Sequence, residues 1–397
     1  MTSFTKHQSN KLLEKNKQIF SNYIKNLITI LPKEYTFEII ISYLQKYYPY
    51  DIQEYNEIYE YYNLKNKKLT ARNIKTRHTF PELTSFLEEL QIIKEILNDK
   101  FKSDFKFNFN EKKQIENLNT FLLERIPKIK RIEDKIKKAK LKAQEVEPLF
   151  LDKLIGYYDR KTTLQKDKIY IFKELERYYC KKTITFFKKK VDTEYNFQLR
   201  EMAFKHLQSL KHFAVLRNQK YMKLHTKNKK RKKFLKNTYA NERFNIKSIP
   251  QELEYRIENS KEQKLNNYHF FISHSSINFE EVQSIIKVLN KENKNVYCDW
   301  INDTSYLKRH LVGDATKSVI EKRLEQSNKV LFIKSKESLL SNWVKYELNY
   351  FNSLNKEILE IDISNLRKGK YEYKRLKEKW FYDENYKNIN LYKNRSE

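Results

Sequence analysis

The chain has 397 residues but only three glycines, Gly156, Gly313 and Gly369, which lie far apart. Glycine allows the positive φ angles and the close backbone approach that phosphate-binding turns require. The sequence therefore excludes a GxxxxGK[ST] phosphate loop and a GxGxxG dinucleotide turn. Residues 1–267 contain a single glycine. Their turns must depend on Asn, Asp and Pro, which favours a helical bundle over glycine-rich hairpins.

Apolar residues between Gln18 and Glu262 recur mostly at intervals of three and four, the period of an amphipathic helix. The clearest stripe runs from Leu83 to Leu97, with Pro81 at a permitted first-turn position. This pattern predicts an all-α domain over residues 1–262. The other expected helices are Lys11–Ile30, Phe37–Tyr47, Lys112–Leu123, Leu164–Cys180 and Glu194–Leu216.

Positive charge is concentrated in the same region. The formal net charge is +30, and residues 1–267 contribute 58 Lys and Arg against 33 Asp and Glu, whereas residues 268–366 contain 13 of each. A basic surface favours contact with nucleic acid or another polyanion. Genome-driven enrichment in lysine is an alternative, although the neutral segment does not share it. The densest group predicted to contact phosphates is Lys229, Lys230, Arg231, Lys232 and Lys233.

Residues 268–366 change to short apolar runs separated by amphipathic stretches. Strand and helix alternating at this spacing predict βαβ units, and hence a parallel sheet with helices on both faces. In such sheets ligands bind beyond the carboxyl ends of the strands. The expected strands are His269–Ile272, Asn295–Trp300, Lys329–Ile333 and Glu357–Ile363. The segments that follow strands are Ser273–Ser276, Asp299–Asp303 and Ser335–Trp343.

Motifs in this segment resemble a bacterial TIR domain over residues 266–397. Phe271–Ser276 is similar to its opening strand and loop, Tyr297–Trp300 to its second strand, and Asn302–Val312 to its BB loop. The most specific feature is Trp343-Val-Lys-Tyr-Glu347, a WxxxE sequence at the start of a helix. The resemblance implies a flavodoxin-like α/β domain after the helical one.

The resemblance also implies an activity, since NAD⁺-cleaving members carry their catalytic glutamate in such a motif. Glu347 is thus the expected catalytic residue of an NAD⁺ nucleosidase, with NAD⁺ as substrate and neither a metal nor a cofactor. A carboxylate can stabilise the positive charge that develops on the ribose as nicotinamide leaves. The alternative is that Glu347 is an ordinary exposed helix glutamate.

Five further residues are candidates for contact with NAD⁺, and each has a structural alternative. Ser273 and Ser275 either donate to phosphate or form the turn, and His274 is either a nucleotide-loop residue or a hydrogen-bonded structural group. Asp299 either contacts ribose or caps the following turn. Trp343 shares a helix face with Glu347, where it either lines the pocket or anchors the helix.

These inferences predict a bacterial antiphage effector in two parts. Residues 1–262 would sense a nucleic-acid or protein trigger or oligomerise, and residues 266–397, including a basic helical tail from Lys368, would self-associate and convert NAD⁺ to nicotinamide and linear or cyclic ADP-ribose. A non-catalytic TIR adaptor and a nucleic-acid sensor with a TIR output domain are the alternatives.

The expected compartment is the reducing cytoplasm. Two cysteines, Cys180 and Cys298, give no disulfide framework and no all-cysteine zinc site. Met1–Phe20 has no apolar core of a signal peptide, and apolar runs such as Phe37–Leu44 are too short to span a bilayer. No contact with a membrane is therefore expected.

Overall fold

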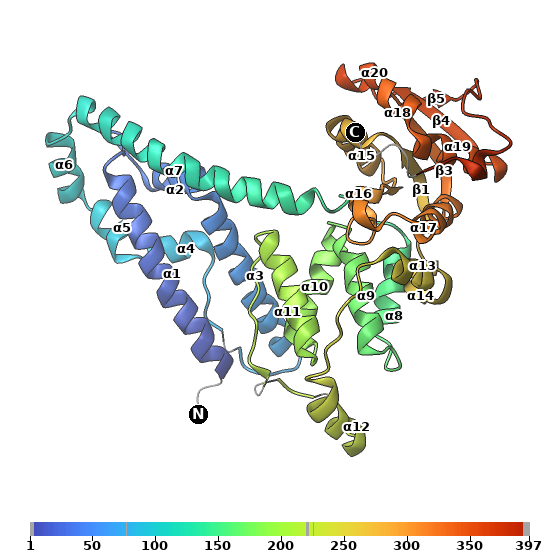
Figure 1. Ribbon diagram of the computed structural model, residues 1–397. Helices are drawn as coiled ribbons and strands as arrows, with labels where there is room; N and C mark the ends of the chain where they lie inside the picture. Colours follow the sequence, from blue (N-terminus) through green and yellow to red (C-terminus); the bar gives the residue numbers. More distant parts are fainter. Residues whose placement is uncertain (1–3, 77, 220–221, 225, 392–397) are drawn as a thin grey trace. The chain divides into compact units, whose positions relative to one another are not determined.

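The computed structural model describes residues 4–76, 78–219, 222–224 and 226–391 (Figure 1). The chain divides into two compact units, the first comprising residues 1–137 and 208–213 and the second residues 138–207 and 214–397. The predicted division at residues 262–266 marks the change from helices to the α/β fold. It differs from the boundary between the compact units, because the helices of residues 138–207 and 214–265 share a unit with the sheet.

The first unit is helical, as its apolar periodicity predicts. Its core is rich in aromatic side chains, among them Phe20, Tyr55 and Phe86, whose rings pack against one another with centroids 4.6–5.6 Å apart. The helices are α1 (Phe4–Ile28), α2 (Phe37–Tyr47), α3 (Pro49–Thr70), α4 (Leu83–Glu88), α5 (Gln91–Ile96), α6 (Asp99–Phe107) and α7 (Glu111–Lys140).

The prediction of one continuous helix over Leu83–Leu97 was wrong. The stripe is divided between α4 and α5, because Leu90 adopts an extended backbone with φ −68° and ψ 128°. Leu87, Leu90 and Ile93 are nevertheless all buried. Periodicity detected the buried face correctly but could not detect a break that leaves the apolar residues either in the core or packed against it.

The second unit begins with helices that support the sheet. The helices are α8 (Phe150–Tyr158), α9 (Gln165–Glu176), α10 (Lys181–Thr193), α11 (Phe197–Ser209), α12 (Lys229–Phe234), the π-helical turn η2 (Leu235–Tyr239), α13 (Pro250–Asn259) and α14 (Lys261–Lys264). Buried aromatic residues again dominate, with the rings of Tyr158 and Phe172 stacked at 5.0 Å.

The sheet confirms the α/β prediction. Its strand order is β2-β1-β3-β4-β5, with four parallel strands and an antiparallel edge strand β5. The strands are β1 (Tyr268–Ser273), β2 (Val296–Tyr297), β3 (Ser327–Lys334), β4 (Glu357–Asp362) and β5 (Lys374–Arg375). The helices are α15 (Phe279–Lys291), α16 (Asp299–Asn302), α17 (Asp314–Glu325), α18 (Lys336–Leu340), α19 (Asn342–Ser353) and α20 (Ile363–Arg367), with the short 3₁₀ turns η3 (Ser276–Asn278), η4 (Arg309–Leu311) and η5 (Tyr386–Asn388).

Alternation along β1 determines what each side chain meets, because successive residues of a strand point to opposite faces. Phe270 and Ile272 pack in one cluster with α15 and α20. Phe271 packs in the other cluster with α17 and α19. Ser273, two residues after Phe271, therefore faces α19 at the carboxyl end of β1.

The predicted helical tail from Lys368 was wrong over the residues described, which end at 391. This segment contains strand β5 and the single 3₁₀ turn η5 rather than a helix. The physical reason is tertiary. Trp380 and Phe381 pack against the α17–α19 face of the sheet, and the Phe381 carbonyl accepts a hydrogen bond of 2.6 Å from Asn349. The Phe381 carbonyl therefore bonds to a side chain of α19 instead of to a backbone N–H, as it would in a helix.

A glutamine from the helical segment covers the outer edge of strand β2, which has no neighbouring strand on that side within the described residues. Gln144 Nε2 donates to the Val296 carbonyl at 2.7 Å, and Gln144 Oε1 accepts from the Val296 N–H at 2.9 Å. This amide thus pairs with β2 as a neighbouring strand would, and an open strand edge is a site for unwanted pairing.

Replacement of Gln144 by leucine is expected to destabilise the second unit by about 2–4 kcal/mol, because two buried backbone groups lose their partners. The measurement is urea-induced unfolding followed by circular dichroism. The matched control is Gln91→Leu, since Gln91 is exposed on α5 and its amide bonds to the exposed Glu95 one turn further on. Equal stability of the two variants would contradict the role given to Gln144.

Among the described residues, no helix is both long and apolar enough to cross a lipid bilayer.

Candidate active site

The candidate site lies at the carboxyl ends of β1 and β3, where the chain order reverses. The chain leaves β1 toward β2 on one side and later returns to β3 on the other side. Ligands of open parallel sheets bind at such a switch point. The loops after the two strands are joined here, because Ser335 Oγ donates to Asn278 Oδ1 at 2.8 Å.

Glu347 is the carboxylate at this point. It lies in the second turn of α19, which begins with the Ser341 hydroxyl accepting from the Val344 N–H. Ser273 Oγ donates to Glu347 Oε2 at 2.6 Å. Glu347 is half-buried as a residue, but its carboxyl group is withdrawn from water. The structure therefore joins two residues that lie 74 positions apart in the sequence.

Burial raises the pKa of Glu347 to about 8, although the hydrogen bond from Ser273 acts in the opposite direction. Repulsion from the Asp299 carboxylate raises it further. A carboxyl group with a pKa near neutrality can exchange protons during a reaction, and its charged form is favoured when positive charge appears beside it.

Asp299 is exposed and opens α16, where its Oδ1 accepts the Trp300 N–H at 2.9 Å. The cap position of α16 is Cys298, so this contact with the next residue does not cap the helix, and both alternatives for Asp299 stay open. The Asp299 charge raises the pKa of Glu347, so the two carboxylates are near enough to repel one another. Because Asp299 faces solvent, it remains accessible to a substrate hydroxyl.

His274 has a hydrogen-bond partner at each ring nitrogen, which is compatible with its structural alternative. Its Nδ1 lies 3.0 Å from the Ile272 carbonyl oxygen, and its Nε2 lies 3.1 Å from Trp300 Nε1. An indole N–H only donates, so Nε2 accepts and Nδ1 carries the proton. This neutral tautomer connects the loop after β1 to Trp300, whose ring also packs against Phe279.

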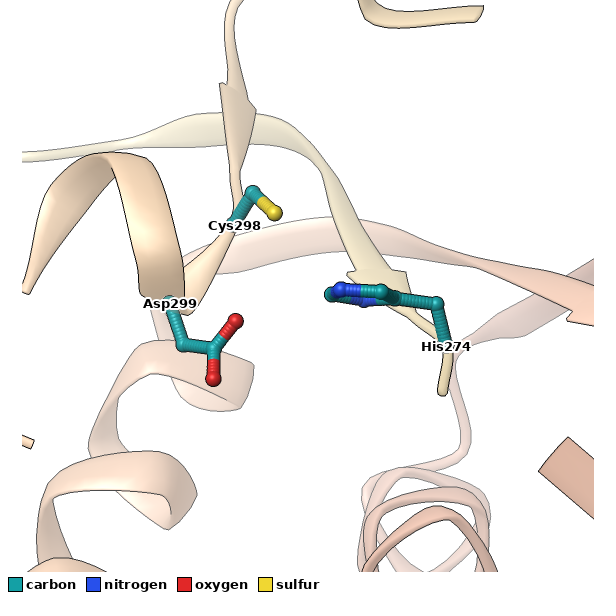
Figure 2. Close-up of side chains that lie close together, drawn as sticks. All are labelled: His274, Cys298 and Asp299. Carbon is teal, nitrogen blue, oxygen red and sulfur yellow. The ribbon is translucent and has the colours of Figure 1, made fainter. Parts of the chain in front are cut away.

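His274, Cys298 and Asp299 form a cluster whose ligand atoms lie within 4.8 Å of one another (Figure 2). A resident metal would require a thiolate and a free imidazole lone pair. Burial raises the pKa of the Cys298 thiol well above its ordinary value, and the acceptor lone pair of His274 is used by Trp300. The donor set therefore does not fit a metal centre.

The two remaining candidates are less closely connected to Glu347. Trp343 lies one turn before it, and its ring packs against the α17–α19 core, which supports the anchoring alternative. The backbone carbonyl of Ser275 accepts the Asn278 N–H at 3.0 Å, as its turn alternative requires. Sequence reasoning did not select Cys298 or Trp300. The predicted strand Asn295–Trp300 contained both residues, whereas β2 ends at Tyr297 and leaves them at its carboxyl end.

The basic group forms α12, whose N-terminal Asn228 side chain accepts the Arg231 N–H at 2.9 Å. Its lysines, Lys229, Lys230, Lys232 and Lys233, are exposed, and Arg231 is half-buried. Exposure is compatible both with binding to phosphates and with a solvated helix, so the predicted contact with nucleic acid stays a prediction.

Comparison with known proteins agrees with this geometry. The family model described as "TIR domain" matches residues 270–386. The chain is 35% identical over 354 residues to the "Putative cyclic ADP-D-ribose synthase TIR2" of Cytobacillus dafuensis, covering 89% of this chain and 90% of that protein. It is 27% identical over 106 residues to the "Probable 3' cyclic ADP-D-ribose synthase ThsB'" of Bacillus cereus (strain MSX-D12), covering 27% of this chain and 53% of that protein. No solved structure matches the chain.

The first of these relatives aligns with the helical region as well as with the α/β segment, since the match covers nine tenths of both proteins. The similarity is therefore one of whole chains, and the parallel sheet with Glu347 at its carboxyl edge lies within the segment matched by the domain model. The chain belongs to the bacterial TIR-domain family.

Proposed function

We propose that this protein cleaves the bond between nicotinamide and ribose of NAD⁺ and converts the remainder to cyclic ADP-ribose. The observation that carries the proposal is the desolvated Glu347 carboxyl group, hydrogen-bonded by Ser273 at the switch point of the sheet. The printed names of both relatives, each a cyclic ADP-D-ribose synthase, support the cyclic product.

The chemistry requires little from the protein besides charge and shape. When the C1′–N bond breaks, its electron pair stays with nicotinamide and neutralises the pyridinium ring, while C1′ becomes electron-deficient. The ionised Glu347 stabilises this oxocarbenium-like centre electrostatically. Asp299, the exposed carboxylate beside it, is suited to accept hydrogen bonds from the ribose hydroxyls.

Ring closure then joins C1′ to a nucleophilic atom of the same ADP-ribose molecule. When that atom is a hydroxyl oxygen, one proton is released as the new bond forms. Glu347, with a pKa near 8, is suited to accept this proton. Attack by water instead would give linear ADP-ribose, so exclusion of water from the site would determine the product.

Uncontrolled loss of NAD⁺ is toxic, so we propose that activity is restrained until TIR domains self-associate during antiphage defence. Large apolar side chains are exposed on the short elements that follow β1 and β3, Ile277 on η3 at 74% and Leu340 on α18 at 66%. Exposed apolar residues of this kind mark surfaces for association. The cytoplasm supplies NAD⁺ and is reducing, which suits the two unpaired cysteines, Cys180 and Cys298.

The test is chromatographic measurement of nicotinamide and ADP-ribose products over a range of protein concentrations. We expect nicotinamide release per mole of protein to rise more than proportionally with concentration, and cyclic ADP-ribose to exceed the linear form. If no nicotinamide is released at any protein concentration, also after fusion to an oligomerising tag, the adaptor alternative would be favoured. Stimulation by added DNA or RNA would favour a nucleic-acid trigger.

A further inference from the structure

A buried arginine in the helical part of the second unit has no anionic partner. Arg200 lies on α11 with 0% of its surface exposed. Its Nη1 donates to the Arg217 carbonyl at 2.6 Å and lies 2.8 Å from the Met222 sulfur. Within the described part of the chain, its Nε and Nη2 atoms are buried and have no hydrogen-bond partner.

One atom of a second guanidinium also lacks a partner in the part of the chain that the structure describes, although Arg217 as a residue is only half-buried. Arg217 Nε is also buried without a partner among the described residues, and its charge is felt at Arg200. Burial lowers the pKa of Arg200 and the Arg217 charge lowers it further, so the two positive groups lie near enough to repel one another. Burial of a charge without a counter-ion is strongly unfavourable, so this arrangement calls for an anion.

The carboxylate that acts electrostatically on Arg200 is already used elsewhere. Glu194 is buried, and its pKa is held below the ordinary value by neighbouring groups despite its burial. Both of its oxygens accept hydrogen bonds from within the helical segment. The donors are Tyr158 Oη, Tyr239 Oη and the N–H groups of Tyr195 and Asn196. Glu194 therefore forms no ion pair with either arginine in the described structure.

The two unpaired atoms of Arg200 suit one oxyanion. Nε and Nη2 lie on one edge of the guanidinium plane, where their parallel N–H groups match two oxygens of one anion. Arg217 Nε is a further donor without a partner among the described residues, on the residue whose carbonyl accepts from Arg200. A tetrahedral phosphate group offers enough oxygens for both arginines, and its charge of about −1.5 to −2 at neutral pH is close to that of two guanidinium groups.

We propose that Arg200 and Arg217 bind the phosphate of a small ligand, either inorganic phosphate or a terminal phosphate monoester. The burial of Arg200 excludes an internal phosphodiester of a nucleic-acid strand, since both of its flanking nucleotides would have to enter with it. This site is built by α11 and the segment after it, whereas Glu347 lies on α19. It is independent of the proposed NAD⁺ cleavage.

The test is thermal unfolding of the full chain in inorganic phosphate, in AMP as a phosphate monoester, and in chloride at equal ionic strength. We expect phosphate or AMP to raise the melting temperature of the wild-type protein by about 3 °C over chloride, since a ligand bound only to the folded state stabilises it. A larger shift with AMP would identify the monoester, and equal shifts would identify phosphate itself.

Three variants make the test specific. Arg200→Met removes the charge. Arg200→Lys keeps the charge but removes the parallel N–H groups of Nε and Nη2. Both variants should therefore lose the rise in melting temperature over chloride. Lys205→Met is the control, because Lys205 is exposed on the same helix and pairs only with Glu201 in the described structure. Equilibrium dialysis with radiolabelled phosphate tests the wild-type protein independently of any variant's folding. No rise over chloride and no bound phosphate, or a rise retained in both Arg200 variants, would overturn the proposal.

Discussion

Replacement of Glu347 by glutamine is expected to lower nicotinamide release from NAD⁺ by about 10³-fold, because the variant keeps the shape of the side chain and loses the charge that stabilises the ribose cation. Glutamine can still accept the 2.6 Å hydrogen bond from Ser273, so the fold should be unchanged. The measurement is initial velocity at saturating NAD⁺. A variant with more than about a tenth of wild-type activity would contradict an electrostatic role for this carboxylate.

The matched control is Glu337→Gln. Glu337 is also a glutamate that follows β3, but it is exposed on α18. Its replacement should leave the rate within about twofold of wild type, since an exposed charge is screened by solvent and salt. Comparison of the two variants separates the effect of one particular carboxylate from the general effect of removing negative charge near the sheet.

The raised pKa of Glu347 predicts how rate and stability depend on pH. Since the ionised form is the active one, kcat/KM should rise with pH toward a pKa near 8. Stability should change in the opposite direction. The folded state holds a proton between pH 4.5 and about 8 that the unfolded state has released, so this residue's contribution to folding becomes less favourable as pH rises through that window. The glutamine variant should therefore be more stable than wild type above pH 8 and equally stable below 4.5.

The sequence predicted the edge of the sheet at which the candidate residues gather, because that edge follows from the order and the ends of the strands. The roles given to these residues stay predictions. The strand Lys329–Ile333 lies within β3, and Ser273 and Glu347 meet at the sheet edge that the βαβ pattern indicates. Parallel strands place their carboxyl ends together, so the position of a residue just after a strand predicts its location in space. The hydrogen bond between His274 and Trp300 could not be predicted in this way, because it depends on the orientation of the Trp300 indole.

The unit boundary was harder to predict for a related reason. Periodicity reports which face of a helix is buried but not against which neighbour. Helices of residues 138–207 therefore read as part of one basic helical domain, although Gln144 and Arg177 contact the α/β segment directly. Contacts between polar residues far apart in the sequence have no periodic signature. The same limitation concealed the buried charges that connect α9 to the loop after β2.

Those buried charges centre on Asp303, which follows α16 at the start of the loop that leads to α17. Its Oδ2 accepts from Arg323 Nε at 2.9 Å, and its Oδ1 accepts from Arg177 Nη2 at 3.0 Å. Arg177 also donates to both oxygens of Glu174 at 2.7–2.8 Å. The four residues have zero net charge when ionised. Burial alone would raise the pKa of Asp303, but the two arginines hold it below its ordinary range.

Replacement of Asp303 by asparagine is expected to destabilise the second unit by about 3–5 kcal/mol, because it leaves a buried positive charge uncompensated. The measurement is urea-induced unfolding. The control is Glu357→Gln, since the Lys329–Glu357 pair is exposed and should contribute little to stability. The depressed pKa also predicts the pH range. The contribution of Asp303 is complete above its unfolded pKa and is lost as pH falls through the lower folded value, so the two proteins should converge in acid. A difference that persists at acidic pH would show that packing, rather than charge, makes Asp303 important to the loop.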